Sequence, residues 1–160
     1  MPEAAVILVV EDREDDFLVL RHAFRAAGIL NPVVWVQSGE EAITYLRGSA
    51  PYSNRKEFPL PLLILLDLKM PGLDGFDIIR YIRARLEFSS IAVIVLTSST
   101  DVKDVQRAYD LGASSFIVKE TEFQDMVTLS KALKDYWLRV NRAVEAQRPR
   151  QESGGSDVRA

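Results

Sequence analysis

The 160-residue chain contains no cysteine, so it can form neither a disulfide nor a thiolate-ligated zinc site. It has no basic run long enough for a nucleic-acid patch, and its net charge is −3, so its charge does not indicate a nucleic-acid partner. Its apolar runs are too short to span a bilayer, and the N-terminus lacks the pattern of a signal peptide. We therefore expect a soluble cytoplasmic protein with no nucleic-acid or membrane partner.

Glycine-rich phosphate loops are also absent, because neither GxxxxGK[ST] nor GxGxxG occurs, which argues against nucleotide binding. Histidine occurs once, at His22. This residue lies about 200° round its predicted helix from the apolar Leu20, and we expect it on the surface rather than in a metal or phosphohistidine site. The hydrophobic fraction, 48%, is ordinary for one globular domain with a real core.

Short apolar runs alternate with segments of helical periodicity five times along the chain. The runs predicted as strands are 5–10, 33–36, 62–66, 91–96 and 115–118. Helices are predicted at 14–27, from Ser38 to Arg47, from Asp74 through Ile82, at 101–111 and at 121–146, with capping boxes at 38–41 and 121–124. Such alternation predicts an α/β fold with a parallel sheet, helices on both faces and right-handed crossovers.

Two other stretches are predicted to lack helices and strands. Residues 48–61 contain three prolines and are predicted as a loop. Residues 147–160 are polar and rich in glycine and serine, so we expect a disordered tail after a single domain at 4–146.

Polar side chains follow four of the predicted strands. Glu11 and Asp12 follow the first, Asp67 the third, Thr97 lies at the end of the fourth, and Lys119 follows the fifth. Because these strand ends meet at one edge of a parallel sheet, we expect the side chains in one crevice. Carboxylates about 4 Å apart repel by roughly 4 kcal/mol at an effective dielectric near 20, so the crevice needs protons or a cation. Oxygen ligands favour Mg²⁺, with Asp12 and Asp67 as direct ligands and Glu11 acting through a metal-bound water.

The same side chains suit phosphoryl transfer. Asp67 can act as a nucleophile and form an acyl phosphate. The ammonium of Lys119 and the hydroxyl of Thr97 can stabilise phosphoryl oxygens. Each of these three residues, taken alone, also has a purely structural explanation. Asp67 fits a helix cap, Thr97 fits a hydroxyl that bonds its own loop, and Lys119 fits a counter-ion to the carboxylates. The joint pattern favours a functional site.

Four segments in this order resemble the receiver domains of response regulators in two-component signalling. They are ILVVED at 7–12, LLDLKMPGLDG at 65–75, VLTSS at 95–99 and GASSFIVK at 112–119. The resemblance covers residues 4–146 and implies a flavodoxin-like (βα)5 fold with the sheet order 2-1-3-4-5. The acidic opening at 10–28 and the proline-rich insert are similar to the stand-alone receivers that partner bacterial phytochromes, which implies a homodimer without an output domain.

The resemblance also implies a mechanism and further residues. A sensor histidine kinase would donate a phosphoryl group to Asp67, and the domain would be a phosphoacceptor rather than an enzyme with its own substrate. The implied Mg²⁺ ligands are Glu11, Asp12, Asp67 and the backbone carbonyl of Lys69. The implied phosphate-binding and switch residues are Thr97, Ser98, Phe116 and Lys119, with Lys69 and Ser99 tuning dephosphorylation. Phosphorylation would remodel the surface of the fourth helix, fifth strand and fifth helix. Phe116 has an alternative as a plain core residue.

Apolar residues at the end of the last predicted helix continue its apolar face beyond the length that is needed to pack against a five-stranded sheet. These residues are Trp137, Val140 and Val144. Either the helix wraps its own domain or this end meets a partner, and we favour a symmetric dimer contact.

The chain departs from the receiver pattern at two places, and a third feature near the crevice is an acidic run. Glu120 stands where most receivers have a proline, so we expect a trans bond after Lys119 and a less firmly held lysine. Many receivers have a polar residue at the position of Lys69, which is a cation in this chain. Its side chain can contact the phosphoryl group or keep water away from it. Glu14, Asp15 and Asp16 form an acidic run that suits a helix N-terminus, and Asp15 is a candidate for tuning the pocket.

Two other functions compete with phosphoacceptance. A pseudo-receiver would keep the fold as a protein-interaction module without being phosphorylated, and Glu120 is its main support. A haloacid-dehalogenase-type phosphatase also uses an aspartyl nucleophile, but Lys69 stands where that family needs its second acid.

Overall fold

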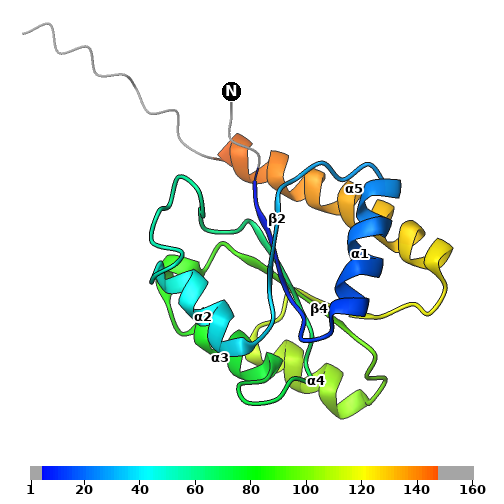
Figure 1. Cartoon of the computed structure of the whole chain (residues 1–160), viewed down its shortest axis with the longest axis horizontal. Coiled ribbons are helices and arrows are strands. Elements are labelled where there is room, and N and C mark those ends of the chain that lie inside the picture. Colours follow the sequence, from blue (N-terminus) through cyan, green and yellow to red (C-terminus); the bar gives the residue numbers. More distant parts are fainter. Residues whose placement is uncertain (1–4, 148–160) are drawn as a thin grey trace, which may run out of the picture.

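The computed structural model describes residues 5–147, with side chains described as far as Tyr136. Within this part the strands form one parallel five-stranded sheet in the order β2-β1-β3-β4-β5, which confirms the predicted topology (Figure 1). The strands are β1 (Ile7–Val10), β2 (Val33–Val36), β3 (Leu63–Leu66), β4 (Ala92–Thr97) and β5 (Ser115–Val118). The helices are α1 (Glu14–Ala26), α2 (Gly39–Arg47), α3 (Gly75–Arg83), α4 (Val102–Leu111) and α5 (Phe123–Gln147), with a short 3₁₀ helix η1 (Leu86–Phe88) that the sequence did not predict.

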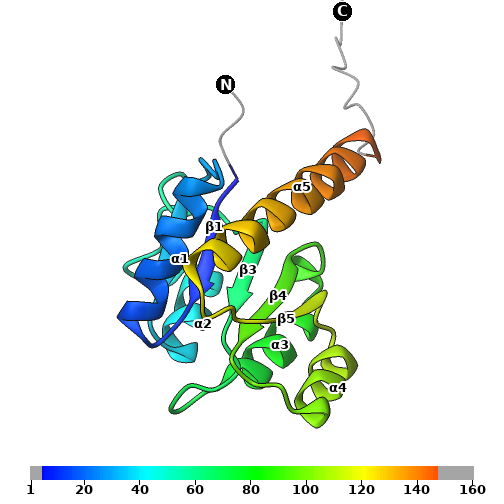
Figure 2. The same ribbon diagram turned by 90° about the vertical axis from the view of Figure 1, so that its right-hand side faces the viewer.

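The helices cover both faces of the sheet. Helices α1 and α5 pack side by side on one face, and α2, α3 and α4 lie on the other (Figure 2). Successive residues of a strand point to opposite faces. Ile7 and Val9 of β1 therefore join the core under α1 and α5, whereas Leu8 and Val10 join the core under α2 and α3. Since β1 is buried on both faces, its sequence reads as a continuous apolar run.

Most helix ends follow the predicted capping. Ser38 accepts a hydrogen bond from the amide of Glu41, and Asp74 forms a reciprocal capping box with Asp77. Helix α4 ends at Gly112, whose φ of 106° suits a residue without Cβ. Helix α5 begins at Phe123, two residues later than predicted, and the capping box predicted at 121–124 is not formed among the hydrogen bonds of the described residues.

The insert at 48–61 is a loop, as predicted, but it packs tightly against α2. Arg55 donates hydrogen bonds to the carbonyl oxygens of Tyr45 and Leu46, at 2.9 and 2.6 Å. These carbonyls belong to the last turn of α2, where carbonyl oxygens lack the full set of helical partners, and that of Tyr45 also accepts from the amide of Gly48. The rings of Tyr52 and Phe58 pack on Tyr45, which closes this side of the core.

Several predictions concern the chain ends and the surface. The backbone of α5 runs through Trp137, Val140 and Val144, but their side chains lie outside the described residues, as does the predicted tail from residue 148 onward. The dimer contact therefore stays a prediction. His22 is exposed, as predicted. No helix in the described part is both long and apolar enough to cross a membrane.

Candidate functional site

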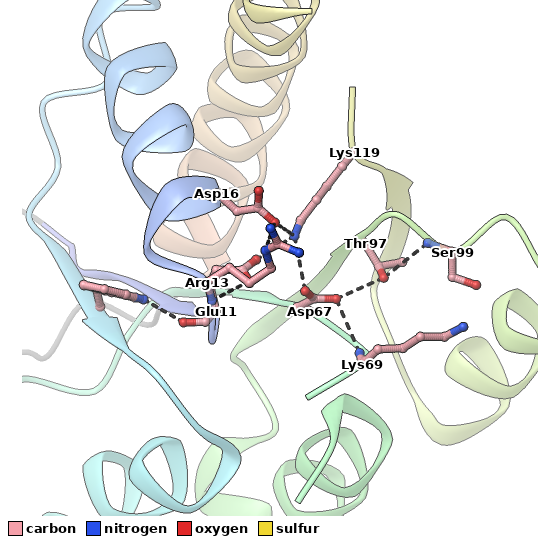
Figure 3. A network of polar contacts seen from close by, with 9 residues as sticks. Glu11, Arg13, Asp16, Asp67, Lys69, Thr97, Ser99 and Lys119 are labelled. Atoms are coloured by element: carbon pink, nitrogen blue, oxygen red, sulfur yellow. Dashed lines mark hydrogen bonds and ion pairs between the residues drawn. The ribbon is translucent and has the colours of Figure 1, made fainter. Parts of the chain in front are cut away.

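The carboxyl ends of β1, β3, β4 and β5 bring the predicted carboxylates, hydroxyl and ammonium together (Figure 3). The Nζ atom of Lys119 lies 2.6 Å from Glu11 Oε2 and 3.2 Å from Asp67 Oδ2. Thr97 Oγ1 donates to Asp67 Oδ1 at 3.0 Å. Residues as far apart in sequence as Glu11 and Lys119 thus meet in one crevice, because parallel strands end at the same edge.

Three carboxylates at this edge fit a divalent cation. Oxygen atoms of Glu11, Asp12 and Asp67 all lie within 4.8 Å of one another. Glu11 and Asp67 are 4% and 8% exposed, and Lys119 supplies one positive charge for this acidic group. A hard, oxygen-only donor set of this size suits Mg²⁺ or Mn²⁺, so the residues present fit the ion that the sequence predicted.

Lys119 is held more firmly than the sequence suggested. Within residues 5–147 the only cis peptide bond joins Ala50 and Pro51, so the bond after Lys119 is trans, as predicted. The expected loosening is wrong, however, because three carboxylates hold the ammonium and the backbone amide donates to the carbonyl oxygen of Thr97 at 2.8 Å. Burial alone would lower the pKa of Lys119, but the hydrogen bond that its ammonium donates to Glu11 and the nearby negative charges raise that pKa above its usual value.

The third carboxylate on Lys119 belongs to Asp16, which the sequence reading missed. Its Oδ2 atom lies 3.0 Å from Nζ of Lys119. Asp15, the residue suggested instead, is exposed and makes no hydrogen bond or ion pair among the described residues. The available signal was helical spacing: Asp16 stands one turn before Leu20, which is buried against the sheet, so the two share a face of α1.

Trp35 on β2 is a second residue that the sequence reading missed. Its Nε1 donates to the carbonyl oxygen of Glu11 at 2.8 Å, and its ring stacks on Phe17 with centroids 4.5 Å apart. The Glu11 side chain also accepts from the amide of Arg13 at 3.1 Å. The backbone that carries the acidic pair is therefore held by β2 and α1 together.

Lys69 and Ser99 converge on α4 rather than on Asp67. The Lys69 ammonium lies 3.9 Å from Asp104 Oδ2, and Ser99 Oγ donates to the same oxygen at 2.7 Å. Only the amide of Lys69 approaches Asp67, at 3.4 Å. Ser98 is exposed at the crevice. Asp104 thus ties the loops after β3 and β4 to the first turn of α4.

Phe116 lies on β5, on the side of the sheet that faces α4. It is half-buried and packs against the core formed by α2, α3 and α4. Its amide donates to the hydroxyl of Tyr109 on α4 at 3.0 Å. The residue therefore links the strand that leads to Lys119 with α4, although its rotamer change stays a prediction.

A cavity of about 410 Å³ opens at the crevice. Its polar wall includes Glu11, Asp67, Ser98 and Lys119, and its apolar wall comes from β1, β3, α1 and α5. Asp67 and Lys119 therefore both border an open cavity at the edge of the sheet.

The burial of Glu11 makes stability depend on pH. Burial raises the pKa of Glu11 from 4.5 to about 7, although Lys119 acts in the opposite direction. An acid with a raised pKa binds more protons in the folded than in the unfolded state between these two values, so stability increases as the pH falls through this window. We expect the metal-free protein to gain roughly 1–2 kcal/mol of unfolding free energy between about pH 7.5 and 5.5.

Urea denaturation in EDTA at a series of pH values measures this effect. Lys119 is charged throughout this window, so its raised pKa adds no slope there. Glu11→Gln should flatten the dependence. If the unfolding free energy of Glu11→Gln still depends on pH in this window, another group causes the effect.

Comparison with known proteins agrees with the fold and the site. Residues 7–131 match the family described as the response regulator receiver domain. The probable methanogenesis regulatory protein FilR2 of Methanothrix harundinacea is 33% identical over 138 residues, which cover 86% of each chain. The response regulator Rcp1 of Synechocystis is 29% identical over 133 residues, covering 83% of this chain and 88% of Rcp1.

Solved structures of response regulators are also similar. The phosphorylated cyanobacterial phytochrome response regulator RcpA superposes with a TM-score of 0.78 at 31% identity, covering 86% of this chain and 96% of RcpA. The Mn²⁺-bound form of Rcp1 superposes with a TM-score of 0.74, covering 84% of this chain and 94% of that one. The family match spans most of this chain, and the sheet order and the acidic crevice agree with it. This chain therefore belongs to the response regulator receiver domain family.

Proposed function

We propose that this receiver domain accepts a phosphoryl group on Asp67 from the phosphohistidine of a sensor histidine kinase, in a Mg²⁺-dependent reaction in the cytoplasm. The observation that carries the proposal is the placing of the buried Asp67 carboxylate between the hydroxyl of Thr97 and the ammonium of Lys119, beside two further carboxylates. The domain acts as a phosphoacceptor and not as an enzyme with a substrate of its own.

The chemistry is an in-line displacement at phosphorus. A carboxylate oxygen of Asp67 forms the new bond to phosphorus while the bond from phosphorus to the imidazole nitrogen breaks, and that nitrogen keeps the electron pair. Lys119 pairs with one phosphoryl oxygen and Thr97 donates to another, so charge that develops in the transition state meets preorganised partners. Glu11, Asp12, Asp67 and the carbonyl of Lys69 would hold Mg²⁺, which neutralises charge on the phosphoryl oxygens.

The proposed output surface lies on α4, β5 and α5. Thr97 must turn toward the phosphoryl group, and Phe116 on the neighbouring strand follows it into the space that is left. Large apolar side chains are exposed on these three elements: Val102, Tyr109, Val118 and Phe123. We place the switched contact here, with Trp137, Val140 and Val144 extending it in a homodimer.

A bacterial phytochrome is the proposed kinase. The support is the similarity to phytochrome response regulators such as RcpA, which spans nearly the whole of that chain. Phosphotransfer from a purified phytochrome kinase, faster than from an unrelated histidine kinase, would support this pairing.

Incubation with acetyl phosphate tests the function directly. Wild-type protein with Mg²⁺ should gain the mass of one phosphoryl group, and the same mixture with EDTA should not. No gain in mass under either condition would favour the pseudo-receiver. Steady release of phosphate from varied esters would favour a phosphatase. The proposal is favoured over the pseudo-receiver because the Lys119 ammonium contacts Glu11 and Asp67 although Glu120 replaces the proline.

A further inference from the structure

We propose that Asp16 is a positioning residue that keeps the Lys119 ammonium at the crevice when a divalent ion takes Glu11 and Asp67 as ligands. The inference rests on the proposed function, because it requires that the crevice binds the ion. It goes beyond that function by assigning a role to a residue of α1 that neither holds the metal nor receives the phosphoryl group.

The ammonium and a divalent ion compete for the same two carboxylates, those of Glu11 and Asp67. Lys119 Nζ now lies 2.6 Å from Glu11 and 3.2 Å from Asp67. These two residues, with Asp12, make up the group of carboxylates that can hold a metal. Mg²⁺ binds oxygen at about 2.0–2.1 Å in a near-octahedral shell. Ion binding must therefore weaken both of these lysine contacts, and the two cations also repel each other.

Asp16 stands outside this competition. It lies in the first turn of α1, four residues after Asp12, and is not part of the group that can hold the metal. Its carboxylate contacts the same ammonium at 3.0 Å, and its side chain is 39% exposed, so it approaches the lysine from the solvent side. Its other ionic contact, to Arg13, is 4.0 Å long and highly exposed.

Without Asp16 the displaced lysine would have no anionic partner. Its side chain is only 16% exposed, and a charge at such a site needs either a partner or water. Asp16 stabilises the state in which the contacts of Lys119 to Glu11 and Asp67 are weakened, and this state is the one that binds the ion. It also keeps the ammonium beside Asp67, where an oxygen of the arriving phosphoryl group can become the new partner of the ammonium.

The dissociation constant of Mg²⁺, measured by calorimetry at fixed pH and ionic strength, tests the inference through a double-mutant cycle. Asp16→Asn should weaken Mg²⁺ binding about fivefold, a coupling typical of groups in direct contact. In a Lys119→Met background the same change should alter the constant by less than about twofold, because no ammonium remains to be held. Asp16→Glu should restore most of the affinity.

Asp15→Asn is the matched control. It removes the same charge from the same helix turn, but Asp15 is exposed and lies outside the Lys119 contacts, so binding should change by less than about twofold. A thermal scan of each variant shows whether it is folded. Unchanged binding in Asp16→Asn would overturn the inference. An equal loss of Mg²⁺ affinity in the wild-type and Lys119→Met backgrounds would also overturn the inference, because Asp16 would then act through its charge alone. Wild-type protein that binds no Mg²⁺ would overturn the proposed function together with the inference, so the two failures are distinguishable.

Discussion

Asp67→Asn is expected to reduce phosphorylation by acetyl phosphate by roughly 10³-fold or more, to below detection. Asparagine has the same shape, but its amide oxygen is not a nucleophile that can form an acyl phosphate at neutral pH. Thr97 and Lys119 contact Asp67 through oxygen atoms, at 3.0 and 3.2 Å, and the amide can keep only one such acceptor. Intact-mass measurement after incubation with Mg²⁺ and acetyl phosphate gives the result.

The fold should survive this substitution. Removing one of several neighbouring carboxylates relieves repulsion, while Lys119 loses one partner of three, so we expect the free energy of unfolding to stay within about 1 kcal/mol of wild type. Asp74→Asn is the control, since Asp74 caps α3 outside the crevice and asparagine caps helices equally well. A full mass gain in Asp67→Asn would place the phosphoryl group on another residue and contradict the proposed function.

Gly75→Ala should destabilise the fold by roughly 2–3 kcal/mol and slow phosphorylation as well. A Cβ atom at Gly75 would lie 2.5 Å from the carbonyl oxygen of Asp67 and 2.7 Å from the Cα atom of Leu68. Both neighbours are backbone atoms, so the loop after β3 must move, and the carboxylate of Asp67 moves with it. Thermal unfolding should show a midpoint lower by roughly 4–10 °C, and the mass assay should show slower phosphorylation.

Gly28→Ala separates this effect from a general cost of replacing glycine. Gly28 has a φ of +78°, and the Cβ of an alanine would meet only the end of the flexible Lys134 side chain. The left-handed backbone should cost about 1–2 kcal/mol, with no change in the rate of phosphorylation. A Gly75→Ala variant as stable and as active as wild type would show that the loop after β3 can shift freely.

The parallel sheet and the members of the crevice were predictable because both depend on local pattern, whereas the order of the strands was implied by the resemblance to receiver domains. Each strand is a short apolar run, and strand–helix alternation leaves few permitted topologies. The bounds of β2 and β5 agree with the prediction, and the other strands differ by one or two residues at their ends. Glu11, Asp67 and Lys119 each directly follow a strand, so their meeting at one edge required no knowledge of side-chain packing.

The same local reasoning failed for Lys119 and for Asp16. The sequence reading inferred a loose lysine from the missing proline, which is a backbone argument about one peptide bond. The lysine is instead held by carboxylates from β1, β3 and α1, and no single segment of the chain contains them. Asp15 and Asp16 look alike in sequence, and only the docking of α1 on the sheet decides which of them faces the crevice.

The sequence by itself determined which chemical groups stand at the strand ends, since a polar residue directly after a buried strand can lie only at the edge of the sheet. The tertiary structure decided which of these groups touch. Contacts such as those from Trp35 to Glu11 and from Lys69 to Asp104 join side chains on separate elements. Their lengths depend on how each helix and strand packs, and packing depends on the whole core rather than on any local pattern.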